Sequence, residues 1–299
     1  MTPTPGTKAT HEPLPAVWSR LVDDAAVFPP GDAPLDEAVA AYTARGDEWC
    51  ADLVGSFVVT DVKVPEVADA APGTPVSLSI VVTGGAGAIA GALRLADKAG
   101  QPVAGIEIAL RDLDDLSGNA RRVVAAVDAA RGEGLLDDGT PVFVELPQQP
   151  PSAAWLAAAD EVAAAELRLK FRTGGVEAAM HPDAATLAGW VDAALDRETP
   201  FKCTAGLHHA VRHTTGEGFE QHGFVNVLLA TRALFDGTPV DAAAELLETR
   251  EPDAVLAGWR AAGDDAMAGA RRWFTSFGSC SVTDPLDDLT ALGLLEAPR

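Results

Sequence analysis

Residues 167–175, LRLKFRTGG, carry the pattern that decides the fold. From residue 167 to residue 172 apolar and basic side chains alternate strictly, with Arg168, Lys170 and Arg172 at the even positions. Successive side chains of a β-strand point to opposite faces, so the segment predicts a strand with one apolar and one basic face. Because the chain has 44 acidic and only 22 basic residues, a basic strand face needs a chemical explanation.

Similar apolar runs, separated by Ala-rich amphipathic segments, continue in both directions along the chain. The helical segment at residues 182–196 begins with Pro182 and Asp183, which are typical helix-start residues. A strand and a helix repeated eight times predict an α/β fold, the closed (β/α)8 or TIM barrel, with an open doubly wound sheet as the alternative. The eight strands are expected at residues 23–28, 54–60, 76–83, 103–110, 141–147, 167–173, 200–206 and 273–281.

One region, residues 207–272, interrupts this alternation with two or three predicted helices in place of one. A long insertion at the catalytic face of a barrel commonly forms a lid or a specificity element. No Pro- or Ser-rich linker separates the region from its neighbours. We therefore expect residues 1–299 to form a single TIM-barrel domain, with a helical insertion or lid at 207–272.

Composition restricts the partners that the protein can have. A formal net charge of −22 argues against nucleic acid or an anionic membrane surface, since both attract basic patches. The N-terminal segment lacks the basic start and apolar core of a signal peptide, and no uncharged apolar run is long enough to span a membrane. These features predict a cytoplasmic protein that acts on a small-molecule substrate; homo-oligomerisation is left open.

The cysteines and lysines are few, and both counts are informative. Cys50, Cys203 and Cys280 are widely spaced and form no CxxC motif, which favours reduced thiols over a disulfide framework. Only five of the 22 basic residues are lysines. An arginine-rich chain can use arginine where only a positive charge is needed. A lysine inside an apolar strand therefore indicates amine chemistry, which a guanidinium group cannot perform.

The central strands direct their charged residues to one place. Residues that face a barrel lumen alternate with residues that face the helices. In four consecutive predicted strands, this alternation sends five charged side chains inward: Glu107, Glu145, Lys170, Arg172 and Lys202. Buried charges are costly unless they are paired, so the pattern indicates either an internal ion-pair network that holds the barrel together or an active site.

In an active site, a lysine of this set can act as a Schiff-base nucleophile. Each lysine of this set lies near a second cation and would be partly desolvated by burial. Both effects are expected to lower its pKa and to leave a neutral amine that attacks a carbonyl group. A nearby carboxylate would then move protons during the reaction.

Residues 167–211 resemble the deoxyribose-phosphate aldolase family of class I aldolases. The family's K-x-x-T-G motif, whose lysine forms the Schiff base, is matched by Lys170, Thr173 and Gly174. Its second lysine and the glycine of the turn that follows are matched by Lys202 and Gly206. The resemblance implies that Lys170 is the nucleophile, that Lys202 lowers its pKa, and that no cofactor is needed.

Weaker matches extend over the rest of the chain. Glu107 in GIEIAL stands where the family has an acidic proton-relay residue, and Asp23 in LVDDAAVF is the candidate relay partner. Gly278 and Ser279 in FGSCS match the final turn, which helps to hold the substrate phosphate in the family.

Two departures from the family pattern predict a different substrate. Ala205 replaces one of two adjacent family glycines, and Arg172 replaces a small residue. The guanidinium of Arg172 could clamp an anionic group bidentately, which favours a small anionic carbonyl compound. The residues expected to bind it are Arg172, Thr173, Gly174, Gly206, Glu145, His208, His209, Gly278 and Ser279.

A histidine cluster after residue 206 supports a second hypothesis. If the segment is helical, His209 and His213 share a face at a spacing that can chelate a metal. Together with His208 and an acidic residue, Glu107 or Glu145, they would form the centre of a metal-dependent lyase or hydrolase. A third hypothesis is a non-catalytic barrel that binds an anionic metabolite, with the lysines as fixed counter-charges.

Overall fold

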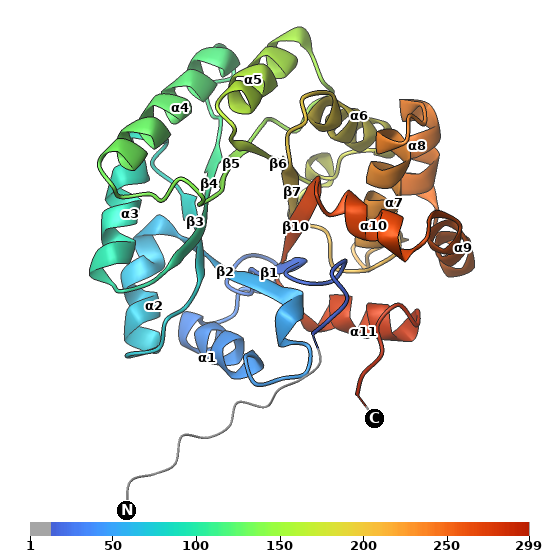
Figure 1. Cartoon of the computed structure of the whole chain (residues 1–299), viewed down its shortest axis with the longest axis horizontal. Coiled ribbons are helices and arrows are strands. Elements are labelled where there is room, and N and C mark those ends of the chain that lie inside the picture. Colours follow the sequence, from blue (N-terminus) through green and yellow to red (C-terminus); the bar gives the residue numbers. More distant parts are fainter. Residues whose placement is uncertain (1–12, 299) are drawn as a thin grey trace, which may run out of the picture.

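The computed structural model describes residues 13–298, and its centre is a closed barrel of eight parallel strands (Figure 1). Around the barrel the strands follow the order β1, β10, β7, β6, β5, β4, β3, β2. Each overlaps one of the eight predicted strands, so the TIM-barrel prediction is confirmed. Their bounds are β1 (Val22–Asp24), β2 (Val54–Thr60), β3 (Leu78–Val82), β4 (Val103–Ala109), β5 (Val142–Glu145), β6 (Arg168–Arg172), β7 (Phe201–Thr204) and β10 (Phe274–Ser279).

Helices between the strands form the outer layer of the barrel (Figure 1). Three of them begin at the capping residues Asp115, Ser152 and Asp183, whose side chains accept hydrogen bonds from backbone N–H groups of the first turn. Asp183 is the predicted start residue. The helices that follow strands β1 to β6, and the one that ends the barrel, are α1 (Leu35–Arg45), α2 (Val64–Ala70), α3 (Ile89–Lys98), α4 (Leu116–Gly132), α5 (Ala153–Ala164), α6 (Ala184–Asp196) and α11 (Thr283–Ala291).

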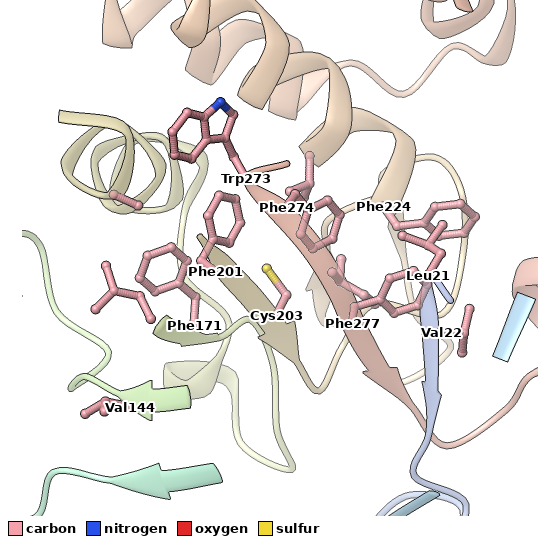
Figure 2. Packing of buried hydrophobic residues seen from close by; sticks show 14 of the residues in the cluster. Leu21, Val22, Val144, Phe171, Phe201, Cys203, Phe224, Trp273, Phe274 and Phe277 are labelled. Atoms are coloured by element: carbon pink, nitrogen blue, oxygen red, sulfur yellow. The ribbon is translucent and has the colours of Figure 1, made fainter. Parts of the chain in front are cut away.

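Aromatic side chains on the outer face of the barrel fix the orientation of β6, β7 and β10. The rings of Phe171 and Phe201 lie 5.0 Å apart, and those of Phe201 and Phe274 lie 5.4 Å apart (Figure 2). Burying a side chain of this size contributes about 1.5–3 kcal/mol. Because neighbouring strand residues point to opposite faces, outward Phe171 and Phe201 direct Lys170 and Lys202 into the lumen.

The insertion contains four helices, so the prediction of two or three was too low. They are α7 (Phe224–Phe235), α8 (Val240–Glu248), α9 (Pro252–Ala262) and α10 (Asp264–Ala270), and a short antiparallel pair, β8 (His213–Thr214) and β9 (Glu220–Gln221), precedes them. Helix α7 packs against β10, α6, α8 and α10, and α8 packs against α6. These contacts place the four helices in the outer layer (Figure 1).

Two expectations from composition can be compared with the fold. Cys50, Cys203 and Cys280 are all free, as predicted. Within residues 13–298, no helix combines the length and the apolar character needed to cross a membrane.

Candidate active site

Six charged side chains from five barrel strands meet in the lumen. The strand register places Glu145, Lys170 and Lys202 at one level of the barrel. The predicted inward direction of the charged residues on β4 to β7 is confirmed by their contacts. The full set is Asp23 (β1), Glu107 (β4), Glu145 (β5), Lys170 and Arg172 (β6) and Lys202 (β7).

Five of these side chains form a continuous series, which we call the lumen ion-pair chain. Lys202 Nζ lies 2.6 Å from Asp23 Oδ2 and 2.7 Å from Glu107 Oε1. The second oxygen of Glu107, Oε2, lies 2.7 Å from Lys170 Nζ. Lys170 Nζ in turn lies 2.9 Å from Glu145 Oε2. Acids and bases therefore alternate, and each lysine is held between two carboxylates.

Arg172 extends this chain to the opening of the barrel. Its Nε donates a hydrogen bond to Glu145 Oε1 at 2.9 Å, while 36% of the Arg172 side chain remains exposed. Glu145, which is predicted to bind substrate, is paired with Lys170 and Arg172 in this structure, and a contact with substrate stays a prediction.

Three serine hydroxyls support the carboxylates of the chain. Ser79 Oγ donates to Glu107 Oε1 at 2.9 Å. Ser56 Oγ and Ser276 Oγ each donate to Asp23 at 2.7 Å. Sequence reasoning missed these serines, although Ser79 and Ser276 lie on the inward positions of predicted strands, where a polar residue among apolar ones is the available signal.

The ion pairs determine which protonation states the lumen favours. Burial by itself would raise the pKa of Glu107 and Glu145, but the neighbouring cations outweigh it and hold both pKa values below the ordinary range. Burial by itself would lower the pKa of Lys170 and Lys202, but the carboxylates raise both pKa values above the ordinary range. The expected lowering of the Lys170 pKa is therefore wrong in direction, because Glu107 and Glu145 raise this pKa more than burial lowers it.

A cavity of about 280 Å³ opens at the carboxyl ends of the strands. Lys170 lines it, whereas Lys202 does not. Its polar lining comes from Glu107, Lys170, Arg172, Thr204, His208 and Cys280, and its apolar wall from Phe28, Pro29, Val58, Val81, Val176 and Met180. The apolar wall was not predicted, because its residues come from four separate segments whose convergence only the closed barrel reveals. No residue of 209–298 other than Gly278 and Cys280 contributes to the lining, so a lid role for the insertion stays a prediction.

Three predicted substrate-binding residues lie outside this lining and hold two turns together. Thr173 Oγ1 donates to the carbonyl oxygen of Ala205 at 2.6 Å. Gly174 and Gly206 are in backbone contact, since a Cβ on Gly174 would lie 2.7 Å from the Cα of Gly206. Gly206 also has a φ of 72°, which favours glycine. These residues position the rim of the cavity.

The rim also carries a histidine and a cysteine. His208 Nδ1 lies 3.2 Å from Ser279 Oγ and 3.7 Å from Cys280 Sγ. Burial is the main cause that lowers the pKa of His208 and raises that of Cys280. Both side chains are therefore expected to be neutral near pH 7. Of the last predicted turn, Gly278 lines the cavity and Ser279 supports His208.

The other histidines do not form a metal site with His208. The segment at 207–212 is irregular, so the expected helical spacing of His209 and His213 is wrong. His209 Nδ1 instead lies 3.1 Å from Asp288 Oδ2 of α11, and its ring contacts that of His213. His209 is not among the lining residues. Within residues 13–298, no three His, Cys, Asp or Glu side chains are grouped so that they could hold a metal ion.

The pKa directions predict how stability depends on pH. The lowered pKa of Glu145 contributes stability above about pH 4.5, the ordinary value, and this contribution is lost as pH falls through the lower folded value. The raised pKa of Lys170 contributes stability below about pH 10.5, which is lost as pH rises through the higher folded value. The free energy of unfolding in urea is expected to decrease from pH 5 to pH 3, and less so in Glu145→Gln.

The exposed Glu133→Gln variant is the control for this measurement, because its partner Arg94 is also exposed. Equal acid-side slopes in the wild type and in Glu145→Gln would contradict a lowered pKa of Glu145.

Comparison with known proteins supports the fold. No protein-family model and no curated protein matches the chain. Among solved structures, it is similar to the tetrameric deoxyribose phosphate aldolase from Aeropyrum pernix, with a TM-score of 0.54, 12% identity and 93% of both chains covered. A structure from Coccidioides immitis assigned to the same aldolase class has a TM-score of 0.48 and 12% identity over 93% of this chain and 88% of that one. The first likeness confirms the predicted resemblance at the level of the fold.

Proposed function

We propose that the protein is an aldolase-type lyase in which Lys170 forms a Schiff base with a small anionic carbonyl compound. One observation carries this proposal. Among the residues that line the cavity, Lys170 supplies the one lysine amine, and carboxylates flank its Nζ at 2.7 and 2.9 Å. A nucleophile and two proton acceptors thus lie next to a space where a substrate fits.

The first step requires a neutral amine, and Arg172 offers a way to obtain it. An anionic substrate group that binds the exposed part of the Arg172 guanidinium weakens the pull of this cation on Glu145. The pKa of Glu145 then rises, because one of the charges that lowers it is shared with the substrate. Glu145 accepts a proton from Lys170 across 2.9 Å and leaves the amine neutral.

The bond changes then involve both carboxylates. Lys170 Nζ forms a bond to the carbonyl carbon, and the carbonyl oxygen takes up protons and leaves as water when the iminium forms. In the cleavage direction, Glu107 accepts the proton of the β-hydroxyl group as the adjacent carbon–carbon bond breaks, so one fragment leaves as a carbonyl compound and the electron pair passes into the enamine. Glu107 then returns the proton to the enamine carbon, which restores the iminium. Lys202 links Glu107 to Asp23, so these groups act as the proton relay. Water hydrolyses the imine and restores Lys170.

The same geometry also fits a non-catalytic barrel that binds an anionic metabolite. The observation in its favour is that both lysines are already held between carboxylates, as in a structural ion-pair network. In such a protein Lys170 would never bond covalently to a ligand. Trapping of the imine therefore separates the two functions.

The decisive experiment is borohydride treatment with a panel of small aldehydes and ketones, followed by intact-mass analysis. We expect an adduct in the wild type and in Lys202→Ala, and none in Lys170→Ala. The exposed Lys98→Ala variant is the control for nonspecific reaction of lysines. The mass of the adduct identifies the carbonyl compound, whereas equal labelling of wild type and Lys170→Ala would refute the proposal.

A further inference from the structure

A second cavity, also of about 280 Å³, lies at the opposite end of the barrel, where the strands begin. Its lining includes three arginines, Arg20, Arg168 and Arg271, and a single acidic residue, Asp23. In a protein with a net charge of −22, such a local excess of positive charge is unusual. The lumen ion-pair chain separates this cavity from the candidate active site, because Asp23 is its end on this side.

The charge of Arg168 has no counter-ion in the described part of the chain. Arg168 is half-buried, and its guanidinium lies 5.6 Å from the centre of the Phe143 ring. No ion pair or side-chain hydrogen bond of Arg168 is found within residues 13–298. Burial lowers its pKa, and no carboxylate offsets that effect. A partly desolvated guanidinium without an ion-pair partner gains from an anion that approaches it, so the site favours an added anion.

The two other arginines do not remove this excess. Arg271 donates to backbone carbonyl oxygens, including those of Val17 and Phe274, and the negative charge of Asp23 acts on it without a direct ion pair. Arg20 is exposed at the rim, with a φ of 53° that turns the chain at this point.

Asp23 cannot act as the missing counter-ion. Its Oδ1 accepts from Ser56, and its Oδ2 accepts from Lys202 and Ser276. Turning this carboxylate toward Arg168 would break those bonds and leave Lys202 with a single partner, Glu107. The positive charge of the cavity therefore has to be balanced from outside the protein.

We propose that this second cavity binds a small oxyanion of the phosphate type, with Arg168 as the principal ligand and Arg20 at the rim. Guanidinium groups match the oxygen pairs of phosphate bidentately, and burial strengthens the interaction. The proposal does not depend on the lyase activity, since the cavity shares no residue with the lining of the candidate active site.

The test is titration of the full chain with inorganic phosphate at constant ionic strength, followed by calorimetry and by thermal unfolding. We expect saturable binding that raises the midpoint of unfolding. Loss of a charged hydrogen-bond partner is expected to weaken binding about tenfold or more in Arg168→Met. Arg20→Gln, a rim variant with little effect on packing, should weaken it less but measurably.

Arg94→Met, which removes an exposed arginine outside both cavities, serves as the matched control and should bind phosphate as the wild type does. Absence of saturable binding in the wild type would overturn the proposal. Loss of binding in Arg172→Met with retention in Arg168→Met and Arg20→Gln would also overturn it, and would assign the anion to the first cavity.

Discussion

Replacing Lys170 with arginine is expected to abolish imine formation and to lower kcat/KM for the trapped carbonyl substrate by about 10⁴-fold or more. Arginine keeps the positive charge between Glu107 and Glu145 but cannot form a Schiff base under these conditions. The variant therefore separates the charge of Lys170 from its nucleophilicity. Steady-state kinetics and borohydride trapping measure the two effects, and circular dichroism verifies that the larger side chain is accommodated.

Lys202→Met tests proton transfer separately from imine formation. It keeps the nucleophile but removes the cation that links Glu107 to Asp23, so proton transfer should slow by about 10²–10⁴-fold while the adduct still forms. Turnover that persists in Lys170→Arg would show that the reaction does not pass through an imine on this residue. A wild type with neither turnover nor a trapped adduct would instead favour the non-catalytic barrel that binds an anionic metabolite.

The order of elements and the direction of the lumen residues could be predicted from the sequence because strand alternation is a local property. In 167–171, each inward residue is flanked by buried apolar residues, so the alternation defines the register. The same logic found Glu107 and Lys202 on their strands. Local alternation does not, however, give distances across the barrel.

The protonation state of Lys170 could not be predicted for that reason. Glu107 on β4 and Lys202 on β7 belong to strands that are not neighbours, yet their side chains meet in the lumen at 2.7 Å. The strand order alone shows two cations, Lys170 and Lys202, on neighbouring strands, which predicts a lowered pKa for Lys170. The closed barrel places Glu107 between them, and the pKa of Lys170 is raised instead.

The metal-binding hypothesis for the histidine segment depended on a helix, which would place His209 and His213 on one face. Residues 207–212 are irregular, so this condition is not met. Asn226 Oδ1 accepts from the backbone N–H of Arg212, and His222 Nε2 lies 2.8 Å from the carbonyl oxygen of Pro182. These long-range hydrogen bonds determine the path of the segment, and no local sequence signal encodes them.

Glu107→Gln is expected to cause the largest loss of stability of any single substitution in the lumen. Glu107 is 1% exposed and accepts hydrogen bonds from Lys170, Lys202 and Ser79. Glutamine keeps the shape but removes the negative charge between two buried ammonium groups, and breaking a buried pair in this way costs about 3–5 kcal/mol. Urea unfolding at pH 7 measures the difference.

The double variant Glu107→Gln/Lys202→Met tests whether this cost arises from uncompensated charge. The double variant removes the Lys202 ammonium group together with the Glu107 carboxylate, and Lys170 stays paired with Glu145. We therefore expect it to be more stable than Glu107→Gln alone. It also provides a folded protein if Glu107→Gln does not fold. Additive losses, or a loss below about 1 kcal/mol in the single variant, would contradict a desolvated ion-pair chain.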